Sequence, residues 1–342
     1  MTSPLPSHPD LRAGFELELL APSGRGRHAL AQALARRVGG AVRYGFKYIS
    51  EGTTPEDRPI CHLTPAYRVL DAQGGVHVTL VDDITIREQL EASAPPGEHG
   101  YRVVMDDLRL ALWLERVAWV EEPRLELMLR SVVETFNVTL PPRPLDEGRH
   151  VVRDPFGNTV CVVEPTGGER ERVCEVVTRP LTRAERRAVL TEILDVAKDL
   201  GFVAPVEAAL HVHLDRAPWM ETRRLTQLIV DHSVLRPMLI TEWQPNPRCR
   251  LLGPFPPHVL RVAEEAPGDL PFAELCAALD LAGATKSSDI NILGVIRPYP
   301  KQPTLEVRSL PMTLDADSLL ESVARVERFL DESARTADQR AQ

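Results

Sequence analysis

The sequence predicts an α+β fold with a largely antiparallel sheet that carries helices on one face. Two patterns support this prediction. Short segments alternate apolar and polar residues with the period of two that is typical of strands, and longer amphipathic segments with helical spacing separate them. The 30 prolines among 342 residues also favour many turns over long helices.

The first elements follow directly from these patterns. Residues 14–20 alternate strictly and predict a strand, whereas residues 28–38 place Leu30, Leu34 and Val38 on one stripe of a helix. Gly39 and Gly40 would end that helix. Further strands are expected at residues 42–50, 132–140, 174–178, 208–215 and 304–310, with glycine-turn hairpins at 67–81 and 151–164.

The remaining helices are identified by their starts and stops. Asp106 and Asp107 predict a cap for a helix through 108–115, and Thr182 with Glu185 resembles a capping box. The predicted helices in the second half of the chain span residues 182–200, 222–240, 259–265, 272–282 and 315–330.

We expect one domain over residues 11–330, between a flexible N-terminus (1–10) and a polar tail (331–342). The hairpin regions at about 60–100 and 140–165 would be insertions, and the proline-rich loop 141–144 is the expected seam.

Composition narrows the classes of function. A hydrophobic content of 43% can fill a core, while a net charge of −9 argues against non-specific binding to nucleic acids or membranes. No segment approaches membrane-spanning length, and residues 1–10 lack the pattern of a signal peptide. Five cysteines without a CxxC pair argue against a disulfide framework. We therefore expect a cytoplasmic protein.

Glu16 and Glu18 share one face of the first predicted strand. Glutamate is a poor strand former, so the pair needs a reason. Either this face meets water, or two carboxylates point into a cleft, where their repulsion favours a cation such as Mg²⁺ or Mn²⁺.

Other strands repeat this pattern with residues that bind metals. His211, His213 and Asp215 share a face of one strand, Glu306 and Arg308 share a face of another, and Glu175 lies in a short apolar strand. Asp215 could orient a histidine or cap a turn. If these strands join one sheet, the sequence predicts a concave face, opposite the helices, that binds metal and ATP.

Phosphoryl transfer suits such a face, because carboxylates can hold Mg²⁺ and an arginine can stabilise phosphate oxygens. The sequence contains no GxxxxGK[ST] motif and no protein-kinase motif set, so any nucleotide site differs from those classes.

Five segments in this order resemble the amidoligase family, which is related to the carboxylate–amine ligases, including glutamate–cysteine ligase and glutamine synthetase. These segments are GFELELLAP, CEVVTRPLT, LHVHLD, SSDINI and TLEVRSLP, and the resemblance spans residues 11–330. It implies a fold like the glutamine synthetase catalytic domain. It also implies an ATP- and Mg²⁺-dependent ligase that joins a small-molecule or peptide carboxylate to an amine or ammonia through an acyl phosphate.

The resemblance also implies roles for individual residues. Catalysis would involve Glu18, Glu306 and Arg308. The residues that would bind the cofactor phosphates or the substrate are His213, Arg308 and Asn291. The implied metal ligands are Glu16, Glu18, Glu175, His211 and Glu306. Two other readings of the same residues stay open, namely a metal-dependent hydrolase and a catalytically silent binding protein. All three functions are compatible with an oligomer.

Overall fold

A computed structural model describes residues 12–49, 61–90, 101–138, 149–165, 168–249, 252–298 and 302–340. They group into two compact units. The first unit comprises the described residues within 12–17, 180–195 and 206–340, and the second comprises those within 18–179 and 196–205.

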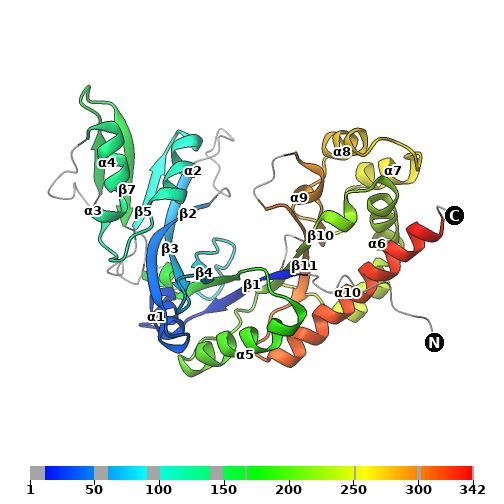
Figure 1. Ribbon diagram of the computed structural model, residues 1–342, viewed down its shortest axis with the longest axis horizontal. Helices are drawn as coiled ribbons and strands as arrows, with labels where there is room; N and C mark the ends of the chain where they lie inside the picture. The colour runs from blue at the N-terminus through cyan, green and yellow to red at the C-terminus, as the bar shows by residue number, and fades with distance from the viewer. Residues whose placement is uncertain are drawn as a thin grey trace. The chain divides into compact units, whose positions relative to one another are not determined.

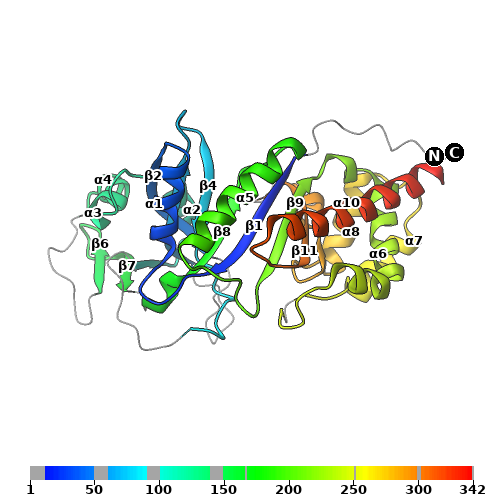
Figure 2. The ribbon, with the colours of Figure 1, turned by 90° about the horizontal axis from the view of Figure 1, so that it is seen from below.

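The first unit is built on an antiparallel sheet with the strand order β10-β11-β9-β1 (β1, β10 and β11 are labelled in Figure 1, and β9 in Figure 2). These strands are β1 (Ala13–Leu20), β9 (Ala209–Asp215), β10 (Ile290–Asn291) and β11 (Thr304–Pro311). Strand β1 enters the second unit with its last three residues, Glu18 to Leu20. The predicted strands at 14–20, 208–215 and 304–310 are therefore confirmed.

Helices of the first unit pack on its strands and on one another. They are α5 (Arg183–Asp199), whose last four residues belong to the second unit, α6 (Thr222–Trp243), α7 (Pro257–Glu265), α8 (Phe272–Leu281), α9 (Leu293–Ile296) and α10 (Ala316–Gln339). Arg186 of α5 lies over the ring of Phe15 in β1, with 5.9 Å from its guanidinium carbon to the ring centroid. Helices α10 and α6 pack side by side (Figure 2).

Local sequence explains where these helices begin. The side chain of Glu185 accepts hydrogen bonds from the backbone N–H of Thr182 at 2.8 Å and from its hydroxyl at 2.7 Å. Asp315 caps α10 by accepting a bond from the N–H of Ser318 at 2.8 Å. The contact predicted between Thr182 and Glu185 is thus present.

The second unit contains a larger antiparallel sheet in the order β8-β4-β3-β5-β7-β6, with β2 on the other side of β3. Its strands are β2 (Ala41–Ile49), β3 (Cys61–Leu70), β4 (Val76–Val81), β5 (Tyr101–Met105), β6 (His150–Arg153), β7 (Thr159–Pro165) and β8 (Val173–Thr178). Its helices are α1 (Arg27–Arg37), α2 (Leu108–Val117), α3 (Leu125–Met128) and α4 (Arg130–Phe136).

Both predicted hairpins are present and close in the same way. Asp71 accepts a backbone bond from Gly75 at 2.9 Å, and Asp154 accepts one from Asn158 at 2.8 Å. In each turn a glycine adopts a left-handed φ, +81° at Gly74 and +88° at Gly157. An aspartate followed by such a glycine explains why the two sequences look alike.

The predicted strand at 132–140 is wrong. Helix α4 covers Arg130–Phe136, and residues 139 and 140 lie outside the described residues. Val132 and Val133 are good strand formers, but Leu129 and Val132 pack at helical spacing into the core of the second unit. Tertiary packing therefore outweighs the local β propensity.

Helix α10 is longer than predicted, since it continues from Leu330 to Gln339 through the expected polar tail. Its last turns bury Ser333 and Ala337. Asp338 accepts hydrogen bonds from Arg224 of α6 at 2.9 Å. Packing against α6 accounts for the extra length.

Some expectations concern segments outside the described residues, namely the flexible N-terminus (1–10) and the seam at 141–144. None of the five cysteines, all of which are described, forms a disulfide. No helix in the described part of the chain combines the length and apolar character needed to cross a bilayer.

Candidate metal centre

Three strands of the first unit bring the predicted polar side chains together. Glu16 of β1 lies opposite His211 of β9, and Glu306 of β11 lies opposite His213 of β9. Side chains opposite or diagonal to one another in an antiparallel pair are neighbours. The alternate residues of these strands, such as Phe15 and Val212, are fully buried.

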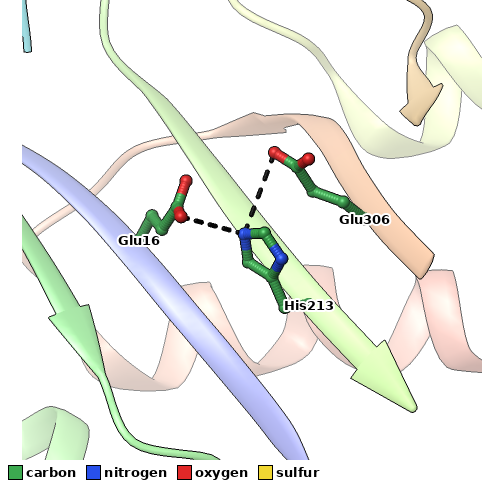
Figure 3. A group of neighbouring side chains, drawn as sticks. All are labelled: Glu16, His213 and Glu306. Carbon is green, nitrogen blue, oxygen red and sulfur yellow. Dashed lines mark ion pairs between the residues drawn. The ribbon is translucent and has the colours of Figure 1, made fainter. Parts of the chain in front are cut away.

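Glu16, His213 and Glu306 form a compact buried cluster, which we call the Glu–His–Glu cluster (Figure 3). His213 Nε2 lies 3.0 Å from Glu16 Oε1 and 3.8 Å from Glu306 Oε1. One ligand atom from each residue lies within 4.8 Å of the others. In Figure 3 both carboxylates lie beside the imidazole on the same side of the strands.

Neighbouring groups orient the members of this cluster. His211 Nδ1 donates a hydrogen bond to Glu16 Oε2 at 2.9 Å and lies 3.7 Å from Glu306 Oε1. His213 Nδ1 lies 2.9 Å from the hydroxyl of Thr304, which fixes its ring. The other ring nitrogen, Nε2, is therefore the one that faces the carboxylates.

The cluster shifts the pKa values of its members. Burial by itself would raise the pKa of Glu16, but the charge of His213 and the hydrogen bond from His211 outweigh it. The pKa of Glu16 therefore lies well below its usual value. Burial would likewise lower the pKa of His213, but the charges of Glu16 and Glu306 raise it. Without a metal, both shifts favour an ionised Glu16 beside a protonated His213.

Glu306 is held from its other side by Asn291 and Arg308. Asn291 Nδ2 donates to Glu306 Oε2 at 2.7 Å, and Arg308 donates to Glu306 Oε1 at 2.6 Å. Because Glu306 accepts both hydrogen bonds, its carboxylate links the Glu–His–Glu cluster to the guanidinium of Arg308 on the same strand. The first unit thus brings together six predicted site residues, namely Glu16, His211, His213, Asn291, Glu306 and Arg308.

A divalent cation would fit the Glu–His–Glu cluster. Two carboxylates and one imidazole form a ligand set suited to Mn²⁺ or Mg²⁺. Nε2 of His213 is buried and faces Glu16 Oε1 at 3.0 Å and Glu306 Oε1 at 3.8 Å. A buried nitrogen that faces two carboxylates is a natural metal ligand.

The structure places Glu18 and Glu175 in the second unit. Glu18 is buried near the end of β1, and Glu175 is partly buried on β8 opposite Val81. The cluster of the first unit is formed without them.

Other acidic residues have structural partners. Asp215 accepts a bond from the N–H of Ala217 at 2.9 Å, which is the predicted turn cap. Asp82, which directly follows β4, is paired with Arg170 at 2.6 Å and lies 3.4 Å from Arg27.

The sequence analysis did not identify Thr304 and Gln302. Thr304 lies two residues before Glu306 in β11 and so shares its strand face, which the alternation in the sequence could have indicated. Gln302 Nε2 lies 3.4 Å from Glu16 Oε1, in a contact that no strand pattern predicts. The second unit also contains a cavity of about 220 Å³ beside Tyr44, Tyr67, Tyr101 and Arg124, and no predicted site residue lines it.

Comparison with known proteins identifies a family. A family model described as "Putative amidoligase enzyme" matches residues 9–324, nearly the whole chain. No curated protein and no solved structure matches the chain significantly. The family match and the ordered segments around the Glu–His–Glu cluster agree, and the chain belongs to the amidoligase family.

Proposed function

We propose that this protein is an ATP- and Mg²⁺-dependent ligase that forms an amide bond between a carboxylate and an amine or ammonia. Membership of the amidoligase family supports an amide-bond ligase. The observation that carries the finer proposal is the buried Glu–His–Glu cluster, whose Glu306 also binds Arg308. We further propose that the first unit resembles the catalytic domain of glutamine synthetase and that the protein acts in the cytoplasm.

Within this proposal, Glu16, His213 and Glu306 hold a divalent cation, which offsets the charge of the nucleotide phosphates. His211 keeps Glu16 oriented through its 2.9 Å hydrogen bond. The resemblance gave His211 as a metal ligand. We propose His213 for this cation, because the ligand atoms within 4.8 Å of one another come from Glu16, His213 and Glu306. Glu18 and Glu175 are proposed as ligands of further cations.

The proposed reaction has two steps. The substrate carboxylate attacks the γ-phosphorus of ATP, so that ADP leaves and an acyl phosphate forms. The amine then attacks the acyl carbon, phosphate leaves, and the amine nitrogen loses a proton. Arg308 stabilises the transferred phosphoryl group, because a guanidinium matches phosphate oxygens. Asn291 keeps Glu306 in place through their 2.7 Å hydrogen bond.

A metal-dependent hydrolase could use the same cluster to activate water, and the two functions differ in their need for nucleotide. ADP release should therefore be measured with Mg²⁺, ATP and a panel of amino-acid and peptide carboxylates with amines. The ligase proposal expects ADP formation that requires both co-substrates and falls to background in E306Q. Hydrolysis of an amide without ATP, together with no stabilisation by Mg²⁺ and ADP, would contradict it.

A further inference from the structure

Asp289 directly precedes strand β10, and two side chains of helix α6 contact its carboxylate. Arg236 Nε donates to Asp289 Oδ2 at 2.7 Å, and His232 Nε2 lies 3.4 Å from the same oxygen. His232 and Arg236 are four residues apart, so both lie on one face of the helix. Asp289 is only 5% exposed. This buried carboxylate therefore joins α6 to the sheet.

The backbone of Asp289 extends this connection to the candidate metal centre. Its N–H donates to the carbonyl of Gly253 at 2.7 Å, and its own carbonyl accepts from the N–H of Arg308 at 2.9 Å. Two residues later, Asn291 lies opposite Glu306 in the β10–β11 pair and donates to its carboxylate. Asp289 therefore contacts the backbone of Arg308 and fixes the start of the strand that holds Glu306.

Aromatic side chains pack around His232. His232 has no exposed surface, and its ring lies 5.2 Å from Phe255 and 6.4 Å from Trp243, measured between centroids. Because the rings of Phe255 and Trp243 pack around His232, helix α6 presents His232 and Arg236 to Asp289 at a fixed position. Of these two partners Arg236 is the closer, so loss of Arg236 would leave the buried carboxylate poorly compensated and let the segment shift.

We propose that Asp289 is a positioning residue for the metal centre. Its pairing with Arg236 holds β10 and the backbone of Arg308, and so places Asn291, Glu306 and Arg308 for cation and phosphate binding. This inference rests on the proposed metal site. It assigns a function to the aspartate of the SSDINI segment and to two residues of α6 that lie far from it in sequence.

The test is a titration of the metal-stripped protein with Mn²⁺, followed by electron paramagnetic resonance, which reports both affinity and ligand geometry. The variants are D289N, R236M and R236K. Asp280 and Arg297 supply the control, because they form an exposed Asp–Arg pair at 3.2 Å in the same unit. D280N removes that pair without touching β10 or β11.

We expect D289N and R236M to weaken Mn²⁺ binding roughly tenfold. This is the lower end of the loss seen when a residue that orients a metal ligand is replaced. They should also broaden the Mn²⁺ signal, while R236K restores much of the affinity and D280N binds as the parent does. The Arg308 amide should exchange its hydrogen faster in R236M. Arg236 is partly exposed, so R236M tests the proposal even if D289N does not fold.

The possible outcomes separate the two proposals. If the parent protein binds no Mn²⁺, the metal site itself is refuted. If the parent binds Mn²⁺ but R236M and any folded D289N match D280N in affinity and spectrum, the positioning role of Asp289 is refuted.

Discussion

His213 Nε2 lies 3.0 Å from Glu16 Oε1, and the two residues come from antiparallel strands nearly 200 positions apart in the chain. Their pKa values move in opposite directions, because burial of each group is outweighed by the opposite charge of the other. In the metal-free protein they form a buried ion pair. A bound cation would take the place of the proton on His213.

This relationship predicts how the stability of the metal-free protein depends on pH. Glu16 has a lowered pKa, so its contribution is present above its reference value of 4.5 and is lost as pH falls through the folded value. His213 has a raised pKa, so its contribution is complete below 6.5 and is lost as pH rises through the folded value. The pair therefore stabilises most between these two reference values.

Thermal unfolding in EDTA should show this window when the parent protein is compared with H213Q. The difference in melting temperature is expected to be larger near pH ~5.5 than near pH ~9, and Mg²⁺ should stabilise the parent more at the higher pH. An equal difference at both pH values would contradict the ion pair.

A second prediction distinguishes the two histidines. H213Q should lose Mn²⁺ affinity by about 100-fold or more, because it removes a ligand nitrogen. H211Q should lose about tenfold, because it removes only the group that orients Glu16. Isothermal titration with Mn²⁺ measures both. A larger loss in H211Q would support the assignment that the family resemblance implies.

Substitution of Arg308 tests the phosphate-stabilising role. R308K keeps the charge but loses the planar fork, so we expect kcat for ADP release to fall roughly 100-fold, with a smaller change in the KM for ATP. R297K provides a matched control on an exposed arginine of the same unit. If R308K turned over ATP as fast as R297K, Arg308 would have no part in the reaction.

The cysteines give a prediction about the fold. Burial raises the pKa of Cys161 to about 12, and Cys61, Cys174 and Cys276 are also buried. Cys249 is partly exposed. At pH ~8 a thiol-specific reagent should label Cys249 rapidly and the other four only after unfolding, since the thiolate is the reactive form. The C249S variant should lack the fast phase, and rapid labelling of Cys161 would argue against the β6–β7 packing.

The site strands could be predicted because their signal is local. Alternation alone put Glu16, His211 and Glu306 on polar strand faces, and the structure confirms those strands. The contact between Glu16 and His213 could not be predicted, because it depends on the register between distant strands. The strand predicted at 132–140 was wrong because packing decides the structure there. Leu129 and Val132 hold α4 as a helix in the core.

The strand β5 also went unrecognised, although Tyr101, Val103 and Met105 alternate in its five residues. Its short length gave little signal, and its pairing with β3 and β7 comes from segments far along the chain. The contact between Asp289 and Arg236 could not be predicted for the same reason, since the two residues are 53 positions apart.

The central claim is that Glu16, His213 and Glu306 hold a divalent cation. Crystals of the protein grown with Mn²⁺ and an ATP analogue, measured at a wavelength that excites manganese, test it most directly. We predict an anomalous peak about 2.0–2.3 Å from His213 Nε2 and from one oxygen of each carboxylate. Saturating Mn²⁺ with a strong peak elsewhere, and none beside these three residues, would contradict the claim.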